Sequence, residues 1–287
     1  MVVRLGLVGR GRWGRNIERT LRSFSDVKLG VIARGEPPPR ELDGVLIATP
    51  SASHAEMALP YIARGIATFI EKPMATSVED AEQLREAARR SGAPVFVGHI
   101  QLFNPAFEAL LGVVPSLGGI HYLLCEGMND RPRTDSSVLW DWLPHHLTMA
   151  RAILRKDPDR VAAWPLANAP VTGAAACRFL FDGIPLVSLL SWHSPEKRQC
   201  AMIAATKGAV RFDDAEERKV AVHGADGQIT YPQYDGELPL TRELKSFVQM
   251  VRERSREPSH IELGIAIVRM IAAAETSMAN DGISVKI

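Results

Sequence analysis

A glycine-rich segment constrains the fold of this chain more than any other feature. It reads Gly9-Arg10-Gly11-Arg12-Trp13-Gly14, follows an apolar run at residues 2–8 and opens a stretch with helical spacing. In such a G-x-G-x-x-G turn, the first glycine permits a tight turn and the second lets the backbone approach a pyrophosphate. The third lets the helix pack closely on the strand. The free N–H groups of the helix then attract phosphates. The segment therefore predicts a dinucleotide-binding turn, whereas the alternative is a purely structural glycine turn.

Strands and helices alternate over roughly the first 100 residues. Apolar runs that predict strands lie at residues 2–8, 27–33, 44–48, 66–70 and 94–97. Helical patterns lie at residues 15–23, 51–64 and 77–91. This alternation is typical of an α/β domain with a parallel, doubly wound (Rossmann) sheet. We assign residues 1–117 to an NAD(P)-binding domain of this kind.

The pattern changes after Gly118. Strands are predicted at residues 120–128, 171–181, 184–193, 199–206 and 219–223, with few helices between them. Two helices, at residues 240–255 and 261–279, and a short strand at 283–287 follow. We therefore expect residues 118–287 to form an α+β domain with a largely antiparallel open sheet.

Composition excludes several classes of protein. Hydrophobic residues make up 46% and charged residues 23%, which is close to the globular average and argues against disorder. The net charge of +1 gives no electrostatic reason to expect nucleic acid or a membrane surface as partner. Cys125, Cys177 and Cys200 lie far apart without C-x-x-C spacing, which favours a reducing compartment and argues against zinc. Because residues 2–6 do not resemble a secretory signal and no apolar run approaches ~18 residues, we expect a cytoplasmic protein.

Arg34 occupies the position that usually discriminates between cofactors. An acidic residue about 20 positions beyond the glycine turn binds the ribose 2′-hydroxyl of NAD. Arg34 could instead bind a 2′-phosphate or stack on adenine, which favours NADP slightly. A solvated loop arginine is the alternative, and Glu36 could restore an acid in a shifted register.

Lys72 is a candidate catalytic residue, because Glu71-Lys72-Pro73 follows a predicted parallel strand. Ligands of open α/β sheets bind outside the carboxyl ends of the strands, so this lysine is expected to reach the crevice. Pro73 biases Lys72 toward an extended backbone. The alternative is a surface lysine at a strand end, yet the chain has only eight lysines.

Asp141 and His145 are spaced by four residues, which places them on one helical face. A carboxylate can then orient an imidazole that takes or returns a proton near neutral pH. Pro144 disfavours a continuous helix, so we expect the helix to begin only after it. His146 makes a metal site or a structural histidine pair conceivable, but no further ligand cluster accompanies it, and we predict no metal.

Together these residues resemble the Gfo/Idh/MocA family of oxidoreductases over nearly the whole chain. The family-wide matches are residues 9–16, 48–54, 71–73 and the pair Asp141 and His145. Further stretches resemble the nucleotide-sugar branch, similar to UDP-N-acetylglucosaminuronate 3-dehydrogenase; they are residues 98–99, 103–106, 133–141, 191–198, 204–208 and 212–214.

The resemblance implies nicotinamide-dependent hydride transfer at a sugar carbon. Lys72, Asp141 and His145 would be catalytic, with His145 the general acid/base. The residues that would contact the cofactor are Gly9, Gly11, Arg12, Trp13, Gly14, Arg34, Thr49, Pro50, Ser53, His54 and Glu71. Asn104, Arg131 and Arg133 would bind a substrate phosphate or carboxylate, although a surface role for both arginines is an open alternative. The resemblance also implies a homo-oligomer, a dimer or a tetramer, and it assigns substrate binding and oligomerisation to the domain of residues 118–287.

The chain departs from the family pattern at two places. His146 and Thr148 stand where the family usually has an acidic residue. Only eight residues, Gly35 to Leu42, separate Arg34 from Asp43, whereas a crossover with a helix needs at least about 10–12. The cofactor domain is therefore expected to lack the unit that flanks the adenine. This shortening motivates a second hypothesis, a non-catalytic sugar-binding or scaffold protein on a degenerate dehydrogenase frame.

Overall fold

The structure, a computed structural model, describes residues 2–33, 35–36, 39, 41–133, 136–166, 172–255 and 259–287, without the side chain of Ser259. The chain divides into two compact units. Residues 1–100 and 238–268 form the first unit, and residues 101–237 and 269–287 form the second.

The first unit contains a parallel sheet of five strands in the order β2-β1-β3-β4-β5. Its strands are β1 (Val3–Val8), β2 (Val27–Ile32), β3 (Gly44–Ile47), β4 (Ala67–Glu71) and β5 (Val95–Gly98). The chain leaves β1 toward β2 and returns to β3 on the other side of β1. The carboxyl ends of β1 and β3 therefore form the topological switch point, where open α/β sheets bind ligands. The predicted Rossmann-type sheet is confirmed.

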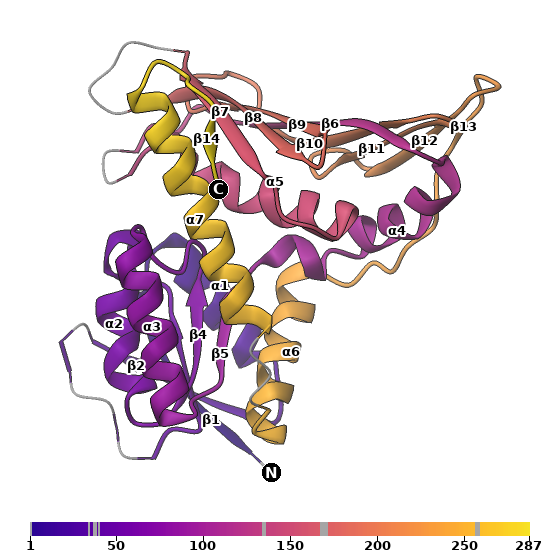
Figure 1. Ribbon diagram of the computed structural model, residues 1–287. Coiled ribbons are helices and arrows are strands. Elements are labelled where there is room, and N and C mark those ends of the chain that lie inside the picture. Colours follow the sequence, from indigo (N-terminus) through magenta and orange to yellow (C-terminus); the bar gives the residue numbers. More distant parts are fainter. Residues whose placement is uncertain are drawn as a thin grey trace. The chain divides into compact units, whose positions relative to one another are not determined.

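Helices cover this sheet (Figure 1). They are α1 (Arg12–Arg22), the 3-10 turn η1 (Ser51–Ser53), α2 (His54–Ile62), α3 (Val78–Ser91) and α6 (Pro239–Glu253), and α7 (Ser259–Ala279) begins in this unit. An aromatic cluster joins α6 to the sheet. Phe69 stacks on Phe96 at 5.4 Å between ring centroids, and Phe247 meets their edges at 5.6 and 5.9 Å. Burying such rings stabilises the core, and so α6 belongs to the unit with β4 and β5 although it is distant in sequence.

The second unit contains a nine-stranded sheet in the order β13-β12-β11-β10-β6-β9-β8-β7-β14. Its strands are β6 (Ile120–Met128), β7 (Arg160–Pro165), β8 (Ala174–Phe181), β9 (Ile184–Ser191), β10 (Arg198–Ala205), β11 (Gly208–Asp213), β12 (Val220–Gly224), β13 (Ile229–Thr230) and β14 (Val285–Lys286). All neighbours pair antiparallel except β6 and β9. The helical segments are η2 (Ile100–Phe103), α4 (Pro105–Val113), η3 (Val114–Leu117) and α5 (Val138–Leu154), which packs on β9, β8 and β6 (Figure 1). The predicted α+β class with a largely antiparallel sheet is confirmed.

The structure corrects one expectation and adds elements that the sequence patterns did not indicate. Helix α5 begins at Val138 and runs through Pro144, so the predicted start after Pro144 is wrong. Pro144 is buried, and packing outweighs the loss of one helical N–H. Strands β7 and β11 were not predicted.

The predicted domain boundary between residues 117 and 118 stays a prediction. In the packing of the structure, residues 238–268 belong to the first unit. A single boundary along the sequence cannot describe this arrangement, because the first unit is made of two separate segments. No helix in the part of the chain that the structure describes combines the length and apolar character needed to cross a membrane.

We expect Ser77→Ala to destabilise the first unit by about 1 kcal/mol, because the serine caps α3. Its Oγ accepts a hydrogen bond from the Asp80 backbone N–H at 3.0 Å. Urea unfolding monitored by circular dichroism measures the effect. Ser116→Ala, which removes an exposed hydroxyl bonded to the Val113 carbonyl, is the control and should change stability by less than about 0.5 kcal/mol. Equal unfolding midpoints for the two variants would contradict the capping role.

Candidate functional site

The glycine turn lies at the switch point of the first sheet, and its three glycines differ in surroundings. Gly9 has a φ of 100°, and a Cβ there would overlap the carbonyl of Ala48 at the end of β3. A Cβ on Gly14 would overlap the carbonyl of Gly9, so the helix packs directly on the turn. Gly11 is exposed, and a Cβ there would meet no atom within 4 Å. The fold thus requires Gly9 and Gly14, whereas Gly11 faces open space at the start of α1, where the glycine motif predicts a pyrophosphate.

Side chains next to the turn hold it in place. Arg10 pairs with Glu18 at 2.7 Å, and Arg22 pairs with the same carboxylate at 2.9 Å. Trp13 is 40% exposed, yet its indole N–H donates to Glu71 Oε1 at 2.5 Å. Arg12, the first residue of α1, is exposed. The turn is therefore fixed both within α1 and to the end of β4.

The residues after β3 form a second turn beside the first. Ser53 Oγ donates to the Pro50 carbonyl at 2.9 Å and lies 3.0 Å from the Thr49 hydroxyl. His54 is buried, with one ring nitrogen 2.9 Å from the Thr49 carbonyl and the other 2.7 Å from the Pro73 carbonyl. Burial lowers the pKa of His54 despite these carbonyls. The His54 ring thus links the turn after β3 to the turn after β4.

Glu71 and Lys72 lie at the carboxyl end of β4, where the sequence placed them. Glu71 is buried and accepts from the Lys72 backbone N–H at 3.2 Å in addition to Trp13. Burial raises the pKa of Glu71 to about 7, against the opposing effects of the Trp13 hydrogen bond and the Lys72 charge. The Lys72–Pro73 peptide bond is cis. One carboxyl group therefore connects the helix of the glycine turn to the backbone of the candidate lysine.

In the second unit, α5 carries both Asp141 and His145. Its Trp142 packs against Gly127 of β6, where a Cβ would clash with the indole. The His145 ring lies edge-on to Trp142 at 6.2 Å. Asp141 accepts from the buried Trp192 indole at 3.0 Å and lies 3.7 Å from Arg133 Nη1. The structure thus brings the candidate aspartate together with Arg133, one of the predicted substrate residues.

His146 is more deeply buried than the adjacent His145. It is buried, and neither ring nitrogen has a hydrogen-bond partner among the described residues. Burial alone lowers the pKa of His146 to about 3, so the ring is neutral. Within the described ranges, no group of three or more His, Cys, Asp or Glu residues could hold a metal ion.

The remaining predicted residues fall into different environments. Asn104 is buried and caps α4 through the Ala106 N–H at 3.1 Å, while its amide donates to Asp214 at 3.1 Å. These bonds give Asn104 a structural task, and its contact with a substrate stays a prediction. Arg131 is exposed, and Arg34 lies outside the described residues. Lys72 belongs to the first unit and Asp141 and His145 to the second, so their joint action also stays a prediction.

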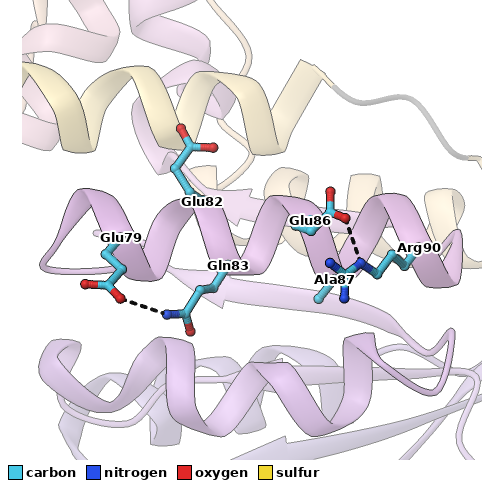
Figure 2. A pocket seen from close by; sticks show the side chains of 6 residues that line it. All are labelled: Glu79, Glu82, Gln83, Glu86, Ala87 and Arg90. Carbon is cyan, nitrogen blue, oxygen red and sulfur yellow. Dashed lines mark hydrogen bonds and ion pairs between the residues drawn. The ribbon is translucent and has the colours of Figure 1, made fainter.

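A surface depression on α3 is separate from these residues (Figure 2). It is lined by Glu79, Glu82, Gln83, Glu86, Ala87 and Arg90. Glu86 pairs with Arg90 at 2.6 Å, one helical turn away, and Glu79 accepts from Gln83 at 3.5 Å. Such exposed pairs one turn apart are typical of a solvated helix face, and we assign no site to it.

Three features of the site escaped sequence reasoning. The Trp13–Glu71 bond joins residues 58 positions apart, and the Trp192–Asp141 bond joins residues 51 apart. The third feature is Glu243, fully buried on α6. A signal for it existed, because Glu243 falls within the apolar stripe of Leu244, Phe247 and Val251.

Comparisons with known proteins agree with the Rossmann-type fold of the first unit. A family model described as "Oxidoreductase family, NAD-binding Rossmann fold" (GFO_IDH_MocA) matches residues 23–99. The crystal structure of a putative oxidoreductase from Magnetospirillum magnetotacticum MS-1 is 31% identical, with a TM-score of 0.85 over 95% of this chain and 99% of that chain.

Two curated relatives differ in their substrates. Inositol 2-dehydrogenase of Rhizobium meliloti (strain 1021) is 21% identical over 97% of this chain and 98% of the enzyme. UDP-N-acetylglucosamine 3-dehydrogenase of Acidithiobacillus ferrooxidans is 25% identical over 56% of this chain and 57% of the enzyme. The comparisons therefore do not single out the nucleotide-sugar branch.

We expect Gly11→Ala to leave folding intact while weakening NAD⁺ and NADP⁺ binding at least about tenfold, because the added methyl occupies the space where the pyrophosphate approaches. Calorimetric titration measures binding, and thermal unfolding measures stability.

Gly14→Ala is the matched comparison. Its methyl overlaps the Gly9 carbonyl, so this variant should lose stability as well as affinity. Wild-type affinity in Gly11→Ala would contradict a pyrophosphate site at this turn.

Proposed function

We propose that this chain, which belongs to the Gfo/Idh/MocA family of oxidoreductases, transfers a hydride between a nicotinamide cofactor and a hydroxyl-bearing carbon of a sugar or nucleotide-sugar. The observation that carries the proposal is the Glu71 carboxyl group, which connects Trp13 of the glycine turn to the backbone of Lys72. A cofactor-binding element and a candidate catalytic lysine are thereby fixed to each other within one unit.

The residues of the first unit suit a dinucleotide. The glycine turn offers open space at Gly11 and the N-terminus of α1 beyond it. When bound, the nicotinamide ring supplies the acceptor or donor of the hydride. NAD is supported by the family description. Arg34 remains the reason to propose NADP as an additional cofactor.

The proposed chemistry needs three tasks from the protein. Lys72 donates a hydrogen bond to the reacting hydroxyl and lowers its pKa. His145 takes the hydroxyl proton during oxidation and returns it during reduction. Asp141, held by Trp192 and Arg133, orients the histidine and complements its positive charge. The hydride and the proton leave the substrate separately, so the hydroxyl-bearing carbon becomes a carbonyl.

The substrate class rests on two kinds of support. Stretches such as residues 191–198 resemble the nucleotide-sugar branch, and Arg133 beside Asp141 could bind an oxyanion. The inositol and nucleotide-sugar relatives both act on ring-borne hydroxyls by their names. We also propose that the protein forms a homo-oligomer. Light scattering that gives the mass of a monomer, 31.5 kDa, would contradict this proposal.

Purified protein titrated with NAD⁺ and NADP⁺, then assayed by nicotinamide absorbance on sugars, UDP-sugars and inositol, tests the function. Reduction of either cofactor by a member of this panel is expected. If the protein binds neither NAD⁺ nor NADP⁺ at millimolar concentration, the proposal is refuted. The non-catalytic sugar-binding or scaffold alternative is then favoured.

We expect Lys72→Met to lower kcat at least about a hundredfold, because it removes the group that stabilises the reacting hydroxyl. Cofactor affinity should change much less, since the backbone N–H that binds Glu71 is retained. Steady-state kinetics and calorimetry separate the two effects.

Lys156→Met is the control, because this lysine pairs with Asp182 on the surface of the second unit. It should keep wild-type turnover. Turnover by Lys72→Met at the wild-type rate would refute the catalytic role.

A further inference from the structure

His54 is a buried side chain whose two ring nitrogens are both occupied. It is the first residue of α2 and is 2% exposed. Its Nδ1 lies 2.7 Å from the Pro73 carbonyl oxygen, and its Nε2 lies 2.9 Å from the Thr49 carbonyl oxygen. The family resemblance placed His54 among the cofactor contacts, but neither ring nitrogen is left for a cofactor. The geometry therefore calls for a role that acts through the two carbonyl groups.

The two contacts differ in how much they need the ring proton. Carbonyl groups only accept hydrogen bonds, so a ring with a single N–H can donate to one of them. Burial lowers the pKa of His54, which favours that singly protonated ring. The contact with Pro73 is buried, whereas the contact with Thr49 is only partly buried. A buried carbonyl without a donor costs more free energy than one that water can reach, so the proton belongs on Nδ1.

The Pro73 carbonyl directly follows the candidate catalytic lysine. On the other side of that lysine, the Lys72 backbone N–H donates to the Glu71 carboxylate at 3.2 Å. Met74, the residue after Pro73, is 1% exposed. The backbone around Lys72 is thus held both before and after the lysine, and His54 provides the hydrogen bond on the carboxyl side.

We propose that His54 is a positioning residue for Lys72, which it holds in place through a hydrogen bond from Nδ1–H to the Pro73 carbonyl oxygen. The bond fixes the segment after β4 against α2 and the turn after β3. It thereby fixes the backbone from which the lysine side chain reaches the reacting hydroxyl. The part that Lys72 plays in the reaction rests on the proposed function, whereas the hydrogen bond does not. Because a displacement of about 1 Å can cost about a hundredfold in rate, this bond affects turnover more than stability.

Nitrogen NMR of the full chain, labelled with ¹⁵N in its histidine rings, tests where the proton lies. At pH 8, above the ordinary histidine pKa of about 6.5, the protonated and the bare nitrogen of a ring give well-separated signals. His54 should show a protonated Nδ1 and a bare Nε2. Its signals are assigned by their loss in His54→Asn or His54→Phe. A proton on Nε2, or one shared equally between the nitrogens, would overturn the proposal.

Three substitutions separate the donor from the packing. The amide nitrogen of asparagine takes about the place of Nδ1, and that of glutamine about the place of Nε2, whereas phenylalanine fills the space without a donor. His54→Asn should lower kcat by less than about threefold, and His54→Gln and His54→Phe by about tenfold or more. Cofactor affinity should fall less than kcat in all three. Equal kcat values in His54→Asn and His54→Phe would overturn the proposal, and so would lost affinity with an unchanged kcat.

His223→Asn is the matched control, because His223 is an exposed histidine on β12 of the second unit. It should leave kcat, cofactor affinity and the NMR signals of His54 unchanged. A loss of kcat equal to that of His54→Phe would mean that the Pro73 contact is not the cause, and the proposal would fail.

Hydrogen exchange without cofactor separates this proposal from the proposed function. Exchange in the peptide of residues 71–78, followed by mass spectrometry, should accelerate severalfold in His54→Phe and stay near wild type in His54→Asn. That result in a protein that reduces neither cofactor would refute the proposed function while leaving the hold on this segment established. Turnover by the wild type with equal exchange in all variants would refute the positioning role and leave the function intact.

Discussion

The close contact between the Gly9 turn and the backbone after β3 is the constraint on which the rest of the first unit depends. It requires a residue without a Cβ at position 9 and another at position 14, where α1 meets the turn. Because β1 and β3 are neighbours in the sheet, this contact lies at the switch point. The Thr49–His54 turn and the Glu71–Lys72 segment are then positioned by adjacent strands, and His54 and Trp13 bind them together.

Much of this arrangement could be predicted from the sequence, because it depends on local patterns. The glycine spacing indicated a strand, a turn and a helix, and the position of Lys72 after an apolar run placed it at a carboxyl edge. The same reasoning failed where packing overrides local preference. Pro144 lies inside α5 because its surroundings are buried, and α6 joins the first unit through Phe247 on Phe69 and Phe96. Neither outcome is encoded within a short window of sequence.

In the candidate site, too, some features follow from local sequence patterns and others only from the folded packing. The candidate catalytic residues Lys72, Asp141 and His145 were predicted from their spacing and neighbours, and their catalytic roles stay predictions. The groups that hold them were not, because Trp13 reaches Glu71 and Trp192 reaches Asp141 only after the chain has folded. Glu243 could have been noticed in the sequence, because an acidic residue within an apolar helical stripe conflicts with the pattern around it. Its lack of a hydrogen-bond partner among the described residues could not.

The short connection between β2 and β3 bears on which parts of the first unit could hold the proposed cofactor. Among the described residues, β2 is the edge of the five-stranded sheet, and Val31 on it is 42% exposed. A further helix and strand would pack there and flank the adenine. The connection between the end of β2 at Ile32 and the start of β3 at Gly44 has eleven residues, 33–43. A crossover with its helix alone needs at least about 10–12 residues, so none remain for a further strand. Under the proposed function, fewer contacts then hold the adenine half of the cofactor. Affinity and orientation must come mainly from the glycine turn and the nicotinamide end, where a buried carboxyl group already ties the turn to the lysine.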